Sequence, residues 1–208
     1  MATKEGVGEN VLTNVMERIV DKKRQWLKAR GVVVDDFDLD VTALNLLASR
    51  SKVEMVALLL NRGFHHTAGD ELGRTALHWA ASYGNIDVVK LLLSRDGDVT
   101  AVSGDGNTAL HDASSSGKME VVTLLLDQGA DIAAVDEDGM TALHLAASYG
   151  KTEVVSLLLA RGADVTAVDE YGKTVLQHAT SLYGNADVVA LLLHRDPDMA
   201  IDDEHSST

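Results

Sequence analysis

One motif recurs along this chain at a constant interval, and that periodicity restricts its fold more than any other feature. A threonine opens each copy at positions 42, 75, 108, 141 and 174, so the interval is 33 residues. The copy that begins at Thr141 is TALHLAASYGKTEVVSLLLARG. A fixed period of roughly 20–50 residues is the signature of a solenoid, in which each unit contacts only its neighbours. We therefore expect one elongated domain rather than two separate ones.

The residues of one copy predict two helices and a turn. Thr141 can cap a helix by accepting a hydrogen bond from a backbone N–H of the first turn. His144, three residues later, can reach back to the threonine as in a capping box. The apolar residues 154–159 predict a second helix, which Gly162 ends as a C-terminal cap. Residues 163–172 are rich in turn formers and predict a hairpin with a glycine at its tip.

These features together resemble the ankyrin repeat, whose motif is T-P-L-H-x-A-A-x-x-G, then V-V-x-L-L-L-x-x-G-A-D, then a hairpin. The resemblance covers residues 42–203 in five in-phase copies. It implies an all-α fold, an ankyrin-repeat solenoid of helix-turn-helix units with short β-hairpin connections. The sequence departs from the family pattern in small ways. Alanine stands where proline is usual, Asp96 replaces a helix-ending glycine, and the last copy has one extra residue before Gly184.

The phase of the repeat predicts the domain organisation. Five repeats are expected at residues 42–74, 75–107, 108–140, 141–173 and 174–203, followed by a flexible tail at 204–208. Residues 1–41 are expected to form an N-terminal helical cap and an acidic connector, the latter at 32–41. Within the cap, residues 10–31 fit either a degenerate ankyrin repeat or one longer amphipathic helix. Both interpretations present a polar outer face, as the end of a stack requires.

Composition excludes several classes of function. The chain has 208 residues, no cysteine and a formal net charge of −14. A disulfide framework and a cysteine zinc site are therefore excluded. The negative charge argues against binding to nucleic acid or to anionic membranes. The first residues contain no apolar run, so we expect no secretory signal, and no stretch approaches the ~20 apolar residues of a membrane span. We expect a monomer in the cytoplasm, or alternatively in the nucleus, that needs no cofactor.

His111, Asp112 and Ser114 are residue types that hydrolases use, but the repeat explains them better. His111 occupies the same repeat position as His78 and His144, which favours a structural role. A catalytic triad is recognised by its geometry rather than by crowding in the sequence. The sequence therefore predicts that the protein is not an enzyme.

A second group of side chains, His65, His66 and Asp70, contains metal-ligating types. The two histidines are adjacent in the chain, and adjacent residues of an extended segment point to opposite sides. We therefore expect no metal site there.

The positions that the repeat leaves free are the candidates for partner binding. In the ankyrin family, the hairpin tips and the ends of the inner helices line a concave groove that grips partner proteins. Tyrosine suits such a groove because it offers a large apolar face at low entropy cost, and acidic tips favour a basic partner. The alternatives are that the tyrosines only pack the turn between helices and that the acidic tips only confer solubility. The predicted partner-binding residues are Asp70, Glu71, Trp79, Tyr83, Asp105, Asp112, Ser116, Asp136, Glu137, Asp138, Tyr149, Asp169, Glu170, Tyr171 and Tyr183.

The sequence thus predicts a non-enzymatic protein–protein interaction module or adaptor whose partner has a basic surface. Two alternatives stay open. One is a stable structural or artificial scaffold, and the other is the recognition domain of a larger protein such as an enzyme. The degenerate first copy and the uneven groove positions favour a natural binder, because an artificial scaffold would have nearly identical repeats.

Overall fold

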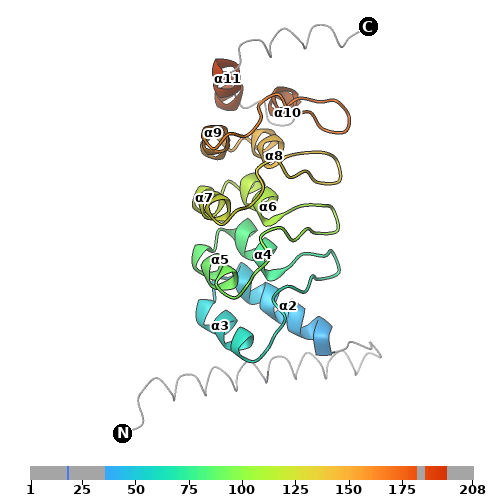
Figure 1. Cartoon of the computed structure of the whole chain (residues 1–208), viewed down its shortest axis with the longest axis vertical. Coiled ribbons are helices and arrows are strands. Elements are labelled where there is room, and N and C mark those ends of the chain that lie inside the picture. Colours follow the sequence, from blue (N-terminus) through green and yellow to red (C-terminus); the bar gives the residue numbers. More distant parts are fainter. Residues whose placement is uncertain (1–17, 19–35, 182–185, 196–208) are drawn as a thin grey trace.

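The computed structural model describes residue 18, residues 36–181 and residues 186–195, and five helix pairs stack in one row within this part (Figure 1). We call the first helix of each pair inner, because it adjoins the hairpins, and the second outer. The inner helices are α2 (Asp36–Ser49), α4 (Ala76–Tyr83), α6 (Ala109–Ser115), α8 (Ala142–Ser148) and α10 (Val175–Ser181). The outer helices are α3 (Val53–Asn61), α5 (Ile86–Leu93), α7 (Met119–Asp127), α9 (Thr152–Ala160) and α11 (Ala186–Arg195).

The predicted threonine cap is confirmed in the central repeats. Thr141 precedes α8 in an extended conformation, and its hydroxyl accepts a hydrogen bond from the His144 backbone N–H at 3.4 Å. The Thr141 N–H in turn donates to Nδ1 of His144 at 3.2 Å. The same capping box is present at the start of α4 and of α6. The T-x-x-H spacing therefore sets where these inner helices begin.

The histidine of the cap also joins one repeat to the next. Nε2 of His78 lies 2.9 Å from the carbonyl oxygen of Asn107, and Nε2 of His111 lies 3.1 Å from that of Met140. A carbonyl can only accept, so the proton is on Nε2 and Nδ1 is left to accept from the threonine. Each imidazole is fully buried. One side chain thus begins a helix and holds the following hairpin against it.

The apolar core runs through the whole stack. Leu110 and Leu143 on the inner helices are 1% exposed, and Leu125 and Leu158 on the outer helices are fully buried. They belong to one apolar cluster that extends from α2 to α11. No helix of the described part is long and apolar enough to cross a membrane.

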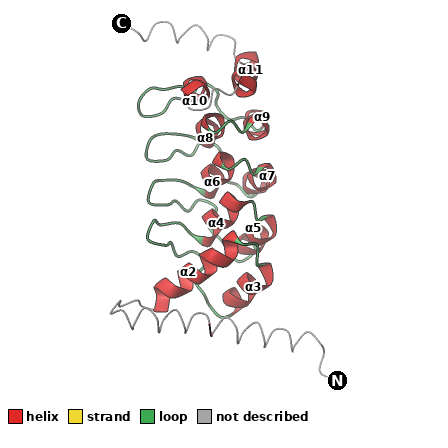
Figure 2. Ribbon diagram, turned by 180° about the vertical axis from the view of Figure 1, so that it is seen from behind, coloured by secondary structure: helices red, strands yellow, loops and turns green. Residues whose placement is uncertain are grey.

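The hairpins project to one side of the stack and lie above one another (Figure 2). A single antiparallel bridge closes three of them, as between Val135 and Thr141. Neighbouring tips are also joined, because the Glu137 N–H donates to the Asp105 carbonyl at 3.1 Å and the Glu170 N–H to the Asp138 carbonyl at 3.0 Å. The short β-hairpin connections are therefore present, and backbone hydrogen bonds hold their tips in register.

The predicted helix ends are confirmed at the outer helices. Gly162 follows α9 with a φ of +89°, in the left-handed region. Asp96 stands at the equivalent place after α5 and adopts a φ of +59°. An aspartate tolerates this conformation better than most residues with a β-carbon, so the corner keeps its shape without a glycine.

The start of the first inner helix differs from the sequence prediction. Residues 32–41 were expected to be a connector, but α2 begins at Asp36, so residues 36–41 are helical. This stretch contains neither glycine nor proline, and Thr42 lies inside α2 rather than before its first turn. Tyr183, residues 10–17 and 19–31, and the predicted tail at 204–208 lie outside the described residues.

Candidate functional site

The inner helices end in exposed aromatic residues. Tyr83, the last residue of α4, is 57% exposed, and Tyr149, which follows α8, is 51% exposed. Ser116 occupies this repeat position between them and lies within hydrogen-bonding distance of the Ser82 hydroxyl, at 3.3 Å. Two tyrosines with a small residue between them are thus available on the described surface.

The hairpin tips carry carboxylates that point to solvent. Five of the predicted tip residues are exposed: Glu71, Asp105, Glu137, Asp138 and Glu170. Tyr171 is also exposed, and its hydroxyl donates to Oδ1 of Asp138 at 3.5 Å. The carboxylates of Glu170 and Asp138 raise the pKa of Tyr171 to about 12, because they stabilise its protonated form. The tips therefore form an acidic rim beside the inner helices.

The first aspartate of three tips has a role that the sequence prediction missed. Oδ1 of Asp136 accepts from the N–H groups of Asp138 at 3.0 Å and Met140 at 2.8 Å, which closes the turn. Asp70 and Asp169 close their turns in the same way. The recurring D-x-x-G of these tips was the available signal, because aspartate commonly accepts from the backbone two residues on.

Trp79 is the centre of a cluster on α4 and the first hairpin. Its indole N–H donates to Oδ2 of Asp70 at 2.9 Å, and its ring stacks on Tyr83 with centroids 6.2 Å apart. The Arg74 guanidinium lies 4.4 Å from the ring centroid and pairs with Asp112 at 3.4 Å. The structure thus brings together four predicted site residues and adds Arg74, which the sequence prediction did not include.

Two adjoining hollows lie beside this cluster. The smaller, of about 210 Å³, is lined by Thr42, Asn45, Leu46, Ser49, Asp70 and Trp79. The larger, of about 360 Å³, is lined by Val41, Thr42, Gly69, Asp70, Glu71 and Leu72. They share Thr42 and Asp70 and so form one depression between α2, the first hairpin and α4. Leu46 and Leu72, which line its two parts, are 50% and 61% exposed. Exposed apolar groups next to acidic groups suit a macromolecular partner.

The comparison with known families agrees with this architecture. A family model described as ankyrin repeats, in three copies, matches residues 14–103 and again residues 110–203. This chain belongs to the ankyrin repeat family. The predicted family and the predicted all-α fold class are therefore confirmed. Ankyrin repeats are in general protein–protein interaction modules. A search of curated proteins finds no match to this chain.

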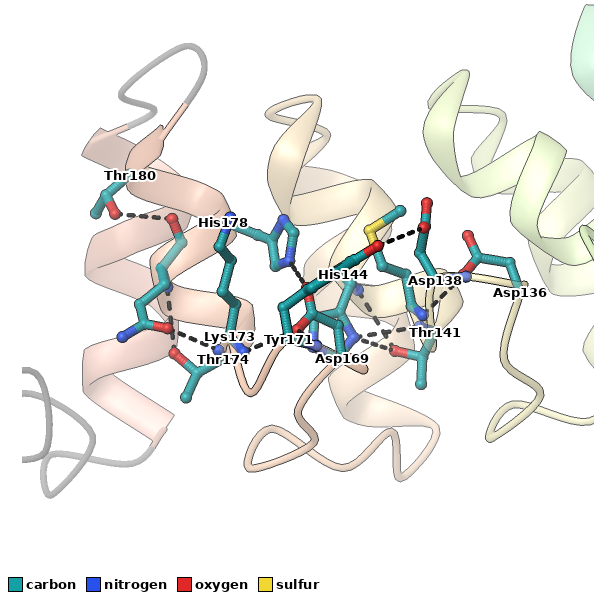
Figure 3. A network of polar contacts seen from close by, with 12 residues as sticks. Asp136, Asp138, Thr141, His144, Asp169, Tyr171, Lys173, Thr174, His178 and Thr180 are labelled. Atoms are coloured by element: carbon teal, nitrogen blue, oxygen red, sulfur yellow. Dashed lines mark hydrogen bonds and ion pairs between the residues drawn. The ribbon is translucent and has the colours of Figure 1, made fainter. Parts of the chain in front are cut away.

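The fourth described ankyrin hairpin holds a second polar cluster, seen from close by in Figure 3. Oδ2 of Asp169 lies 2.8 Å from Nε2 of His178, and the His178 ring meets that of His144 edge-on with centroids 5.4 Å apart. His178 occupies the repeat position of Trp79, and Asp169 that of Asp70. Asp169 is only 6% exposed, so its carboxylate faces its own repeat rather than solvent. The sequence prediction missed His178, although its equivalence to Trp79 indicated the pairing.

Burial is the main influence on the pKa values of the three histidines in the capping boxes. Desolvation lowers the pKa of His78, of His111 and of His144. Burial raises the pKa of Asp112, and Arg74 opposes that rise. Both ring nitrogens of His111 are engaged, with Thr108 and with Met140, so this histidine cannot accept a proton from a substrate.

Neither candidate for chemistry gains support from the described geometry. Ser114 is fully buried, so its hydroxyl is not accessible as a nucleophile. Within residues 36–181 and 186–195, no group of three or more histidine, aspartate or glutamate side chains is placed to hold a metal ion.

Proposed function

We propose that this chain is a non-enzymatic adaptor or inhibitor that binds a partner protein in the groove formed by its inner helices and hairpin tips. It acts alone in the cytoplasm or as the recognition domain of a larger protein. The observation that carries this proposal is the depression at Trp79, where exposed apolar side chains lie beside an exposed carboxylate. The binding energy of an interface is concentrated in a few anchors, and aromatic residues such as Trp79 and Tyr83 are typical of them. Charges at the rim mainly affect the association rate and its salt dependence.

The charge of the tips indicates the chemistry of the partner. Five exposed tip residues are acidic, Glu71, Asp105, Glu137, Asp138 and Glu170, and the chain as a whole carries a net charge of −14. A partner with a basic surface would approach faster, because opposite charges steer diffusional encounter. A structural scaffold, the main alternative, gives no reason for aromatic side chains to be left exposed beside a hollow.

The test uses the two exposed tyrosines. The partner is first recovered by pull-down from the native host and purified, and its affinity is then measured by calorimetry. We expect the double change Tyr83→Ala, Tyr149→Ala to weaken binding by roughly 2 kcal/mol or more, because aromatic anchors dominate interfaces. The matched control is Met119→Ala, which removes a side chain that is 47% exposed on the outer helix α7.

The thermal midpoint of the double variant decides between binding and packing. We expect it to stay close to that of the unmodified chain, since both rings are more than half exposed. Unchanged binding by the double variant contradicts the proposal. If the variant unfolds, the tyrosines serve to pack the helices, and this result contradicts the proposal as well.

A further inference from the structure

We propose that the depression between α2, the first hairpin and α4 is the anchor site for one lysine or arginine side chain of the partner. This inference rests on the proposed function and specifies what enters the groove at its N-terminal end. The aliphatic stem of the basic side chain lies against Leu46 and Trp79, and its cationic head reaches Asp70 and Glu71. Long basic side chains combine an apolar stem with a charged end in this way.

The apolar wall of the site is held in place before any partner binds. The hydrogen bond from Trp79 to Asp70 at 2.9 Å and the stacking on Tyr83 fix the indole. Leu46, on the neighbouring inner helix α2, is half exposed and lines the same hollow. A wall that needs no ordering on binding lowers the entropy cost of association.

Three polar side chains of the site, those of Asp70, Glu71 and Asn45, carry acceptor oxygens. Within the part of the chain that the structure describes, the Asp70 carboxylate accepts from two backbone N–H groups and from the indole, which are all neutral donors. Glu71 is exposed and lines the larger hollow. Asn45 is 6% exposed and lines the smaller hollow, and its buried Oδ1 has no hydrogen-bond partner among the described residues. Acceptors without cationic donors favour a ligand that brings N–H groups and positive charge.

Arg74, a cation of the described part of the chain next to the site, pairs elsewhere. The guanidinium of Arg74 lies over Trp79, but it pairs with Asp112 on the next inner helix. Asp112 therefore compensates most of the positive charge of Arg74. The negative charges of Asp70 and Glu71 stay available to a ligand. A negatively charged ligand would be repelled by both carboxylates, and an apolar one would leave the acceptors unpaired.

The equivalent positions of the other described repeats do not reproduce the site. In the second hairpin Ser103 replaces Asp70 and Asp112 replaces Trp79. In the third hairpin, Asp136 occupies the position of Asp70, but Leu145 replaces Trp79 and is only 9% exposed. In the fourth, the carboxylate of Asp169 is buried against His178. Among the described repeats, the first hairpin therefore combines an acidic rim and an aromatic wall in a way that the others do not.

The indole N–H of Trp79 makes the site observable by nuclear magnetic resonance. The chain contains two tryptophans, Trp26 and Trp79, so the change Trp26→Phe leaves one indole signal in the ¹⁵N-labelled full chain. The probe is Nα-acetyl-lysine methylamide, and the control probe is the norleucine analogue, which keeps an apolar stem but lacks the ammonium group. We expect a saturable shift of the indole signal with the lysine probe and roughly 5-fold weaker binding of the norleucine probe, the effect of one charge pair.

Two variants and one matched control locate the binding. Leu46→Ala and Glu71→Gln should each weaken the lysine probe by roughly 2–5-fold, from lost apolar contact and from a lost charge respectively. Glu137→Gln changes the net charge equally at the same hairpin position two repeats away, and should leave binding unchanged. The proposal is overturned if the norleucine probe binds as tightly as the lysine probe, or if Glu71→Gln and Glu137→Gln weaken the lysine probe equally. It is also overturned if the lysine probe causes no saturable shift of the indole signal.

One further variant tests whether the chain fills the site itself. Lys22, Lys23 and Arg24 form a basic stretch outside the described residues. If their joint replacement by alanine moves the indole signal and tightens the lysine probe, the site belongs to this chain and the partner proposal is wrong. No native partner is used in these titrations. A failed tyrosine test would therefore leave this result standing, and a failure here would leave the wider groove proposal standing.

Discussion

The central repeats and the terminal repeats use different residues three positions after the threonine. The central ones have His78, His111 and His144, whereas the first has Asn45 and the last has Gln177. The histidines of α4 and α6 make two kinds of hydrogen bond at once, one to the helix cap and one to the carbonyl of the following hairpin. The terminal repeats show what each half of that arrangement does.

Asn45 keeps the bond between repeats. Its Nδ2 donates to the Arg74 carbonyl at 3.1 Å, the same hairpin position that His78 reaches one repeat later. Because α2 continues back to Asp36, Thr42 is not a cap, and Oδ1 of Asn45 is left without a partner among the described residues. This asparagine therefore joins the stack without beginning a helix.

Gln177 keeps the cap. Its Oε1 accepts from the Thr174 N–H at 3.0 Å, and its own N–H donates to the Thr174 hydroxyl at 3.2 Å. This is the T-x-x-Q form of the capping box. Asn45 shows that a side chain can join repeats without beginning a helix, and Gln177 shows that the capping box forms without a histidine. In α4 and α6 one histidine both completes the helix cap and bonds to the following hairpin, because its two ring nitrogens face opposite ways.

The largest test of this comparison removes apolar contact from the middle of the stack. Leu143 on α8 is 1% exposed, so Leu143→Ala should lower the free energy of unfolding by about 2–5 kcal/mol through lost burial and a cavity. Leu46→Ala, on the half-exposed side of the first repeat, should cost less than about 1 kcal/mol. Urea denaturation measures both, and hydrogen exchange should rise first in the repeats next to α8. A loss below about 1 kcal/mol for Leu143→Ala contradicts its place in the core.

A smaller change separates the two tasks of the histidine within one repeat. His111→Gln keeps the cap but leaves the Met140 carbonyl without its donor, which should cost about 1–3 kcal/mol. His111→Asn should cost about 1 kcal/mol, because an asparagine at this position can reach the hairpin but does not complete the cap. Both are measured against the unmodified chain by urea denaturation at neutral pH. Equal stability of all three proteins would show that neither bond contributes.

The buried histidines also predict a dependence of stability on pH. Burial lowers the pKa values of His78, His111 and His144, so the unfolded chain binds more protons than the folded chain once the pH falls to the ordinary histidine pKa of about 6.5. The stability is complete above that pH and is lost as the pH decreases below it. We expect a lower urea midpoint at about pH 5.5 than at about pH 7.5. The urea midpoint of His111→Gln should change less between these two pH values than that of the unmodified chain. An equal change in both proteins would show that His111 does not contribute to the pH dependence.

The sequence predicts the helices of this protein well because each is set by local signals that recur. The threonine caps, the apolar outer helices and the left-handed Gly162 all follow from residues within one repeat. The start of α2 at Asp36 could not be predicted from the period, because the sequence before Thr42 does not carry the hairpin motif of the later copies.

The candidate site is less predictable, since it depends on which residues meet across repeats. Glu71 and Tyr83 are exposed, but Asp136 closes its own turn, and the pairing of Arg74 with Asp112 joins different repeats. Contacts of this kind follow from the stacking of repeats, which the motif of a single repeat does not encode.

The smallest expected effect concerns the corner after an outer helix. Gly162 has a φ of +89°, and an added β-carbon would meet nothing within 4 Å. Gly162→Ala should therefore cost the backbone strain, partly offset by the lower entropy of the unfolded chain, a net loss of about 0.5–1 kcal/mol. Asp96 stands at the same position two repeats earlier and already adopts this strained conformation, with a φ of +59°. Asp96→Gly relieves it but adds entropy to the unfolded chain, so we expect a gain of only a few tenths of a kcal/mol. Thermal denaturation of both variants measures the difference. A lower melting temperature for Asp96→Gly would show that the aspartate side chain, rather than the backbone, stabilises this corner.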